Sequence, residues 1–221
     1  MNYSRIDNKL PVAKEGIPFI LIGCLITLIL LFVPFLWPAI TAAILTIFVA
    51  CFFRDPERKT SAPEGAILTP ADGRVCQIKK TDGKETPLGT EALRISVFMS
   101  IFNVHVNRMP AGGTIQDVRY RPGTFFSANL DKASEQNESN TIILESDLGC
   151  KMAVVQIAGL IARRIACWVE NSDVVKRGQR FGLIRFGSRL DIYLPTHTEI
   201  CVELGQRVKS GKTVIGNLKQ R

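Results

Sequence analysis

A glycine–serine pair, Gly187–Ser188, interrupts a stretch of alternating apolar and polar residues that runs from Phe181 to Leu194. The alternation predicts two β-strands with a short break between them. The simplest interpretation is a strand bend with a solvent-facing serine. The same pair can also support chain cleavage, because glycine tolerates the strained backbone in which a serine hydroxyl attacks the preceding carbonyl.

Such a cleavage involves no hydrolytic attack on the backbone. Attack by the hydroxyl converts the amide into an ester, and removal of the serine α-proton then eliminates the ester and breaks the chain. The dehydroalanine that remains hydrolyses to a pyruvoyl group, which is a ketone at the new N-terminus. Ser188 is therefore a candidate nucleophile, and a nucleophile of this kind needs a neighbouring base.

Histidine is the usual general base near neutral pH, and the chain has two. His197 lies in a Pro-Thr-His-Thr turn, which indicates a solvated loop residue. His105 follows a strongly apolar segment, although a lone histidine there is more often structural. Asp72, in Thr-Pro-Ala-Asp-Gly, is by itself an ordinary turn residue. Sequence spacing does not show whether Asp72, His105 and Ser188 meet.

A long apolar segment precedes these residues. Residues 16–53 contain no charged side chain, and the run is well beyond the ~20 residues that one membrane crossing needs. Pro34 and Pro38 interrupt it near the middle, which predicts a membrane-embedded helical hairpin or a re-entrant pair. Basic residues on both flanks favour two cytoplasmic ends. The run is too long for a cleaved signal peptide.

The composition narrows the class of partner. The chain has 221 residues, a net charge of +8 and a pI near 9.4, which suits nucleic acid or an anionic membrane surface. The apolar segment favours membrane lipids, and the lack of interleaved aromatic residues argues against nucleic acid. The six cysteines form no C-x-x-C pair, so we expect reduced thiols and no metal site.

From Arg54 onward, short apolar runs alternate with Gly, Asp and Pro turns, which predicts a mainly β sandwich or barrel with minor helix. We expect eight or more short strands, for example Ala66–Thr69, Arg74–Ile78, Leu93–Met99, Thr141–Leu144, Met152–Ile157, Leu183–Phe186, Asp191–Leu194 and Glu199–Val202. Only Gly159–Val169 could be a helix, and its residues are equally compatible with a strand. We therefore expect a membrane-anchoring segment, 1–53, and a β-rich domain, 54–221.

Two Val-Lys-x-Gly turns, at 175–178 and 208–211, also occur in lipoyl-type carrier domains. A membrane-tethered lipoyl-like carrier or binding module without catalytic activity is therefore an alternative. Such a carrier needs a lysine at a hairpin tip, and the nearest match is Asp131-Lys132-Ala133, whose polar setting indicates a loop.

Several motifs, in this order, resemble those of phosphatidylserine decarboxylase proenzymes, most closely the short archaeal-type branch. They are Thr-Pro-Ala-Asp-Gly (69–73), Phe-Asn-Val-His-Val-Asn-Arg-Met-Pro (102–110), Arg-Pro-Gly-Thr-Phe-Phe (121–126), Asp-Lys-Ala-Ser (131–134) with Asn-Glu (137–138), Gln-Ile-Ala-Gly-Leu-Ile-Ala-Arg-Arg-Ile (156–165) and Phe-Gly-Ser-Arg-Leu-Asp (186–191). The resemblance covers about residues 50–217.

The resemblance implies self-cleavage between Gly187 and Ser188, giving a β chain, 1–187, and an α chain, 188–221. Ser188 would become the covalent pyruvoyl cofactor, which accepts electrons as phosphatidylserine loses carbon dioxide and becomes phosphatidylethanolamine. By similarity, Asp72 would orient His105, and His105 would activate Ser188.

The resemblance also has implications for binding and location. Arg108, Arg121 and Arg189 are candidate ligands for the anionic groups of the substrate. The chain departs from the larger family members by having Phe-Gly-Ser-Arg at the cut and by having Arg108 or a neighbour in place of a second histidine. Related enzymes imply a homodimer, at the cell membrane with the catalytic domain on the cytoplasmic side.

Overall fold

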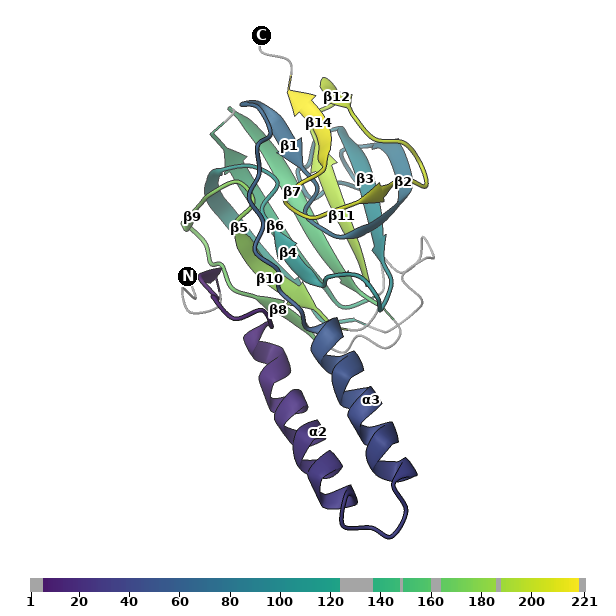
Figure 1. The fold of residues 1–221 in the computed structure, drawn as a ribbon. Coiled ribbons are helices and arrows are strands. Elements are labelled where there is room, and N and C mark those ends of the chain that lie inside the picture. The colour runs from purple at the N-terminus through teal and green to yellow at the C-terminus, as the bar shows by residue number, and fades with distance from the viewer. Residues whose placement is uncertain (1–5, 124–136, 148, 160–163, 186–187, 219–221) are drawn as a thin grey trace.

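The computed structural model describes residues 6–123, 137–147, 149–159, 164–185 and 188–218, and shows a β-rich body from which two helices project (Figure 1). The helical elements are a 3-10 turn, η1 (Lys14–Gly16), and the α-helices α2 (Ile17–Leu30) and α3 (Trp37–Phe52). The strands are β1 (Ala66–Leu68), β2 (Gly73–Thr81), β3 (Ala92–Met99), β4 (Val106–Arg108), β5 (Gly113–Arg121), β6 (Ser139–Ser146), β7 (Cys150–Ala158), β8 (Ile165–Cys167), β9 (Val174–Val175), β10 (Arg180–Ile184), β11 (Ser188–Leu194), β12 (Thr198–Ile200), β13 (Arg207–Val208) and β14 (Val214–Leu218).

The strands form three antiparallel sheets. The large, curled sheet has the order β13-β2-β3-β11-β7-β6-β5-β9, and the two small sheets have the orders β4-β10-β8 and β1-β14-β12. The main core contains buried apolar residues from all three sheets, including Leu190, Leu183 and Ile67. The mainly β prediction is therefore confirmed.

Each of the eight predicted strands overlaps an observed one, because half-buried strands alternate apolar and polar residues. Six observed strands, β4, β5, β8, β9, β13 and β14, have no counterpart among those eight. Of the two interpretations of Gly159–Val169, the described residues fit the strand, because Ile165–Cys167 forms β8 beside β10. Residues 160–163 lie outside the described part.

The predicted break between two strands is also a change of sheet. β10 pairs with β4 and β8, whereas β11 lies between β3 and β7 near the middle of the large sheet. The chain therefore leaves one sheet at Ile184 and enters another at Ser188. Gly187 lies outside the described residues.

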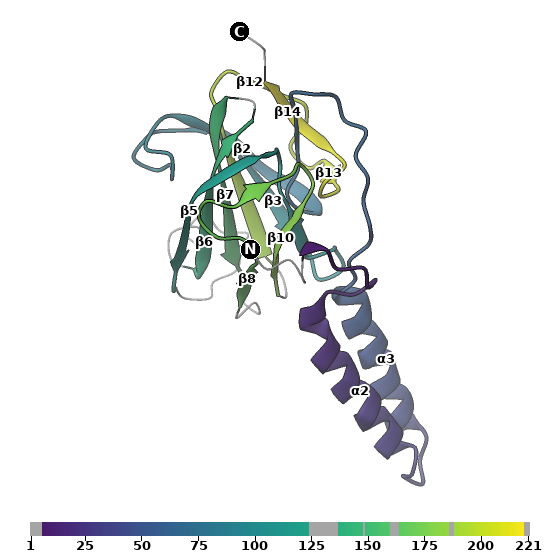
Figure 2. The same cartoon turned by 90° about the vertical axis from the view of Figure 1, so that its left-hand side faces the viewer.

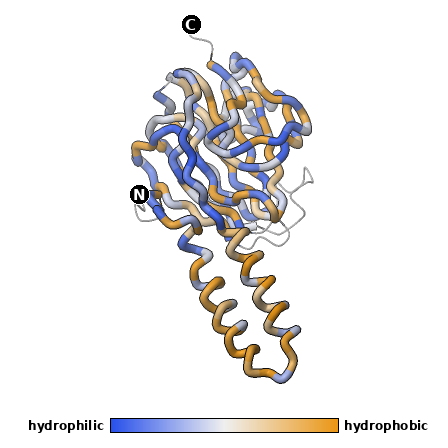
Figure 3. Tube along the Cα trace, viewed as in Figure 1, coloured by the Kyte–Doolittle hydropathy of each residue, from blue (hydrophilic) through white to orange (hydrophobic). Residues whose placement is uncertain are grey.

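The apolar N-terminal segment forms two antiparallel helices that pack against each other (Figure 1). Gly23 allows the close approach, because a Cβ there would lie 2.5 Å from the Thr46 hydroxyl. Figure 3 shows the helices as a mostly hydrophobic pair, and many of their large apolar side chains are exposed, for example Ile22 and Ile44. The helices have 14 and 16 residues. Within the described ranges, no helix combines the length and apolar character that a membrane crossing requires.

The base of this helical pair is fixed to the β body. The Ala13 N–H donates to the Phe53 carbonyl at 2.8 Å, and Phe52 and Phe53 are buried in the main core. From α3, residues 54–65 run along the body to β1 (Figure 2). The end of α3 is therefore part of the core rather than a loose tether.

Asp55 is the main ionic anchor of this connector. Its buried carboxylate accepts from Arg180 Nε at 2.9 Å and from Arg108 Nη2 at 3.4 Å. The Asn8 side-chain amide also donates to it, at 3.3 Å. A carboxylate shared by two buried guanidinium groups stabilises the fold mainly because its absence leaves both charges uncompensated.

We expect Asp55→Ala to lower the free energy of unfolding by about 3–5 kcal/mol. Chemical unfolding in detergent, followed by circular dichroism, measures this change. Asp117→Ala is the matched control, because Asp117 pairs with Arg119 at the surface, where an ion pair contributes about 0–1 kcal/mol. Equal losses in the two variants would contradict the anchoring role of Asp55.

Candidate active site

Ser188 is the first residue of β11 and is completely buried. Its strand partners are Met99 on β3 and Ala158 on β7. The Ser188 hydroxyl oxygen is one of the buried side-chain atoms that has no hydrogen-bond partner within the described structure. A buried, unpaired hydroxyl is unfavourable for stability alone. The observation therefore points to a chemical role for this hydroxyl.

His105 lies in the loop between β3 and β4, not in a strand. Its Nδ1 is 2.9 Å from the Asn103 carbonyl oxygen. Because a carbonyl only accepts, Nδ1 carries the proton, and the lone pair is on Nε2. Nε2 is buried and has no hydrogen-bond partner within the described residues.

The surroundings of His105 keep it neutral. Its ring packs on Phe52 at the end of α3, with ring centroids 4.1 Å apart. Burial lowers the pKa of His105 to about 4, and the nearby Arg54 charge acts in the same direction, whereas the Asn103 hydrogen bond and the Asp72 charge oppose it. At pH 7 the imidazole is therefore a free base.

Asp72 precedes β2 and has different partners from those expected. Two nitrogens of the Arg58 guanidinium donate to its carboxylate, Nη2 at 2.9 Å and Nη1 in a shorter contact. The Ser210 N–H donates to the same carboxylate at 2.8 Å. The structure therefore places Asp72 near enough to His105 to affect its charge, but not in hydrogen-bond contact with it.

The sequence did not predict two of the residues that contact Asp72. Arg58 lies in the connector after α3, and it also donates to the Ser210 carbonyl at 2.6 Å. Ser210 lies far along the chain, in the second Val-Lys-x-Gly turn. No local sequence pattern connects Arg58 or Ser210 with Asp72. The sequence alone therefore gives no signal for this cluster.

A chain of buried amides lies on the Ser188 face of the large sheet. Asn140 donates to Gln156 at 3.0 Å, and Gln156 donates to Asn107 at 2.8 Å. Asn107 in turn donates to the Met99 sulfur at 3.7 Å, and Met99 is the strand partner of Ser188. This polar chain, which was also not predicted, fixes the positions of side chains around the start of β11.

Two of the three predicted substrate arginines are bound internally. Arg108 Nη1 donates to the Gly178 carbonyl at 3.1 Å, and Nη2 donates to the Pro56 carbonyl at 3.0 Å and to Asp55. Burial lowers the pKa of Arg108 to about 10. Arg108 therefore joins the segment after α3 (residues 54–65) to the β body.

Arg189 is paired with Asp191 on its own strand. Nε and Nη2 of Arg189 donate to the two Asp191 oxygens at 2.6 and 2.9 Å, and Nη2 also donates to Ser96 Oγ at 2.9 Å. Both charged side chains are buried. Side chains of β3 and β11 thus hold the buried Arg189 guanidinium in place on one face of the large sheet.

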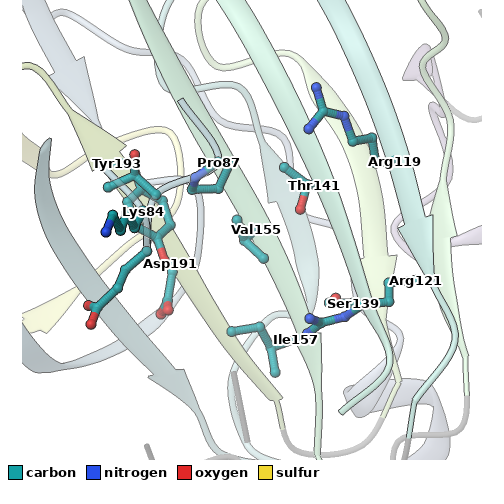
Figure 4. A pocket seen from close by; sticks show the side chains of 12 residues that line it. Lys84, Pro87, Arg119, Arg121, Ser139, Thr141, Val155, Ile157, Asp191 and Tyr193 are labelled. Atoms are coloured by element: carbon teal, nitrogen blue, oxygen red, sulfur yellow. The ribbon is translucent and has the colours of Figure 1, made fainter. Parts of the chain in front are cut away.

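Arg121, the third, ends β5 and lines a cavity of about 330 Å³ (Figure 4). Asp191 and Tyr193 line the same cavity. Because side chains alternate along β11, these two point to the face opposite Ser188. The structure therefore brings Asp72 and His105 near one another and separates Arg121 from the Ser188 hydroxyl.

Comparison with known proteins decides the family. The sequence profile described as "Phosphatidylserine decarboxylase" matches residues 45–216. The chain belongs to the phosphatidylserine decarboxylase family. It is similar to the phosphatidylserine decarboxylase proenzyme of Syntrophus aciditrophicus, with 50% identity over 208 residues, which cover 93% of this chain and 96% of that protein.

Two further relatives extend almost over the whole chain. The proenzyme of Geobacter sulfurreducens is 50% identical over 218 residues, covering 96% of this chain and 99% of that protein. The proenzyme of Desulfotalea psychrophila is 45% identical over 213 residues, with the same coverage. The phosphatidylserine decarboxylase family is a family of carboxy-lyases, and membership disfavours the lipoyl-like carrier.

Proposed function

We propose that this chain is a proenzyme that cuts itself between Gly187 and Ser188, and that the mature form converts phosphatidylserine to phosphatidylethanolamine. The proposal is based on the environment of the Ser188 hydroxyl, at the point where the chain passes from one sheet to another. Its hydroxyl is buried and has no hydrogen-bond partner within the described residues. Family membership supports the same reaction.

In the self-cleavage step, the Ser188 oxygen forms a bond with the Gly187 carbonyl carbon, and the peptide C–N bond breaks. His105 is the proposed base, because its neutral imidazole has a free lone pair on Nε2. Loss of the Ser188 α-proton then breaks the Cβ–O bond and releases the Gly187 carboxylate. One water converts the remaining dehydroalanine to the pyruvoyl group and ammonia.

The residues around Ser188 fit such a group. Ser188 stands at the start of a buried strand, so the new terminus is held by its neighbours Met99 and Ala158 on both sides. The pyruvoyl group would supply an electron sink for the loss of carbon dioxide. A buried site also excludes water from the reacting carbon.

The direct test of the reaction uses phosphatidylserine labelled in the serine carboxyl group, presented in mixed micelles. We expect the purified protein to release labelled carbon dioxide and to form phosphatidylethanolamine in equal amounts. Phosphatidylethanolamine added as the starting lipid provides the control, because it has no carboxyl group to lose. An intact chain that releases no label would overturn the proposal.

We further propose that α2 and α3 embed in the cell membrane, with the β domain on the cytoplasmic side. The exposed apolar side chains of both helices support this location. Basic residues at the helix bases would face anionic headgroups, each contributing about 1 kcal/mol of attraction. The implied homodimer remains a prediction, which sedimentation of the detergent-solubilised protein tests.

For the membrane proposal we expect a double variant, Ile22→Asp with Ile44→Asp, to lose most of its flotation with anionic vesicles. Ile22 and Ile44 are 56% and 61% exposed, and two carboxylates in the lipid interior cost several kcal/mol. Leu204→Asp is the control, since Leu204 is 68% exposed on the β body. Undiminished flotation of the double variant would exclude insertion of the helices.

A further inference from the structure

A second cavity, of about 620 Å³, lies at the base of the helices. Its lining includes four cationic side chains, those of Arg54, Arg74, Arg207 and Lys209, and one carboxylate, Asp72. Asp72 is already paired with Arg58. The cavity therefore presents an excess of positive charge, and its volume is in the range of small-ligand sites.

Arg74 and Arg207 face each other directly across the pairing of β2 with β13. Like charges in this position repel and destabilise the sheet. Within the described residues, neither arginine forms an ion pair with a carboxylate. Lys209 follows two residues after Arg207 and is also exposed. Among the described residues, three cations thus line a space whose one carboxylate, that of Asp72, is already paired with Arg58, and an anionic ligand would stabilise this arrangement.

The cavity adjoins the loop that holds His105. Asn103 lines it, and the Asn103 carbonyl contacts His105 Nδ1 at 2.9 Å. Phe98 and Ser100 also line it. Because side chains alternate along β3, these two lie on the face opposite Met99, the strand partner of Ser188. The cavity therefore approaches the candidate site from the His105 side, and in the proposed substrate only a few bonds separate the phosphodiester from the serine carboxyl group.

The rim of the cavity is continuous with the helical pair. Phe102 lines the cavity and is 71% exposed. Its ring lies edge-on to Phe48 of α3, with centroids 6.4 Å apart. Arg54 shapes the same rim by donating to the Phe102 carbonyl. A ligand with an anionic head and apolar chains would place the head among the cations and the chains along α3.

We propose that this cavity binds the phosphodiester of the phospholipid, with Arg74, Arg207 and Lys209 as its ligands. The proposal rests on the proposed function for the identity of the lipid. The assignment of a phosphate-binding site depends only on the residues that line the cavity. It assigns substrate affinity to residues distinct from Ser188 and His105.

Kinetics in mixed micelles test the substrate role. We expect Arg74→Ala and Lys209→Ala each to raise KM for phosphatidylserine by about tenfold, the effect of losing one charge-assisted hydrogen bond. We expect kcat and the extent of self-cleavage on a denaturing gel to be unchanged. Lys151→Ala is the control, because Lys151 is an exposed lysine on β7. An unchanged KM in both test variants would overturn the proposal.

A binding experiment separates this proposal from the proposed function. Short-chain phosphatidylethanolamine and inorganic phosphate are titrated calorimetrically into wild type and into Arg74→Ala with Arg207→Ala. Weakened lipid binding in the double variant supports the proposal even if no decarboxylation is observed. Lipid binding that is unaffected, or inorganic phosphate that binds as tightly as the lipid, would overturn it.

The Tm of the ligand-free protein distinguishes a binding role of Arg74 and Arg207 from a purely structural one. If Arg74 and Arg207 are retained for binding, removing either relieves their repulsion, and Tm rises or stays constant. A clear drop in Tm for both variants would show that the pair is structural and would contradict the proposal.

Discussion

Ser188→Ala is expected to remain a single full-length chain and to release no carbon dioxide from phosphatidylserine. The variant lacks the oxygen that attacks the Gly187 carbonyl, so neither the ester nor the pyruvoyl group can form. Activity should fall by on the order of 10⁴-fold or more, the scale seen when the nucleophile of a covalent catalyst is removed. Mass spectrometry of the purified protein measures the chain, and the labelled-lipid assay measures activity.

The substitution is mild structurally, which makes the result interpretable. The Ser188 hydroxyl has no hydrogen-bond partner within the described residues, so its loss should not destabilise the fold. Ser188→Cys is the companion variant, because it keeps a nucleophile at the same position and should still cut the chain slowly. Fragments beginning at residue 188 in Ser188→Ala would show that another group performs the cleavage.

His105→Asn is expected to slow self-cleavage by about 10²–10⁴-fold, the usual contribution of a general base. An asparagine amide can still donate to the Asn103 carbonyl, which His105 contacts through Nδ1, but it cannot accept a proton at neutral pH. Cell-free synthesis of the proenzyme, sampled over time on denaturing gels, measures the rate. Cleavage at the wild-type rate would exclude His105 as the base.

The pH dependence gives a second, independent measurement of His105. Because burial lowers its pKa from about 6.5 to about 4, the imidazole stays neutral over most of the acidic range. Wild-type cleavage should therefore stay nearly constant from pH 8 down to about 5 and decline only near pH 4. A decline centred near 6.5 would show that the base is solvated.

The same shift affects stability, with a definite sign. His105 binds a proton more readily in the unfolded chain than in the folded protein. Its contribution to the free energy of unfolding is therefore fully present above pH 6.5. That contribution is lost as pH falls from 6.5 toward 4, and amounts to about 3 kcal/mol. Circular dichroism over the same pH range separates unfolding from loss of the base.

Structural coupling between His105 and the helices follows from the fold. The His105 ring packs on Phe52, and Phe52 ends α3, while Arg54 beyond it contacts the β3–β4 loop through the Phe102 carbonyl. The segment proposed to enter the membrane thus contacts the proposed base directly. The position of the helices and the position of His105 are set by the same packing.

The sequence by itself predicted eight of the observed strands and the helical pair, and it supplied three candidate catalytic residues. Strands such as β3 and β7 are readable because a half-buried strand alternates its side chains locally. The two helices are readable because Pro34 and Pro38 interrupt an uncharged run. Ser188, His105 and Asp72 were found through motifs, which are also local.

Only the tertiary structure decided which groups meet. Asp72 pairs with Arg58 and Ser210, and His105 donates to Asn103 instead. Arg189 is held by Asp191. Arg74 and Arg207 are more than a hundred residues apart in sequence, yet they lie opposite each other in one sheet. These contacts depend on strand order and register, which residue types along a single segment do not specify.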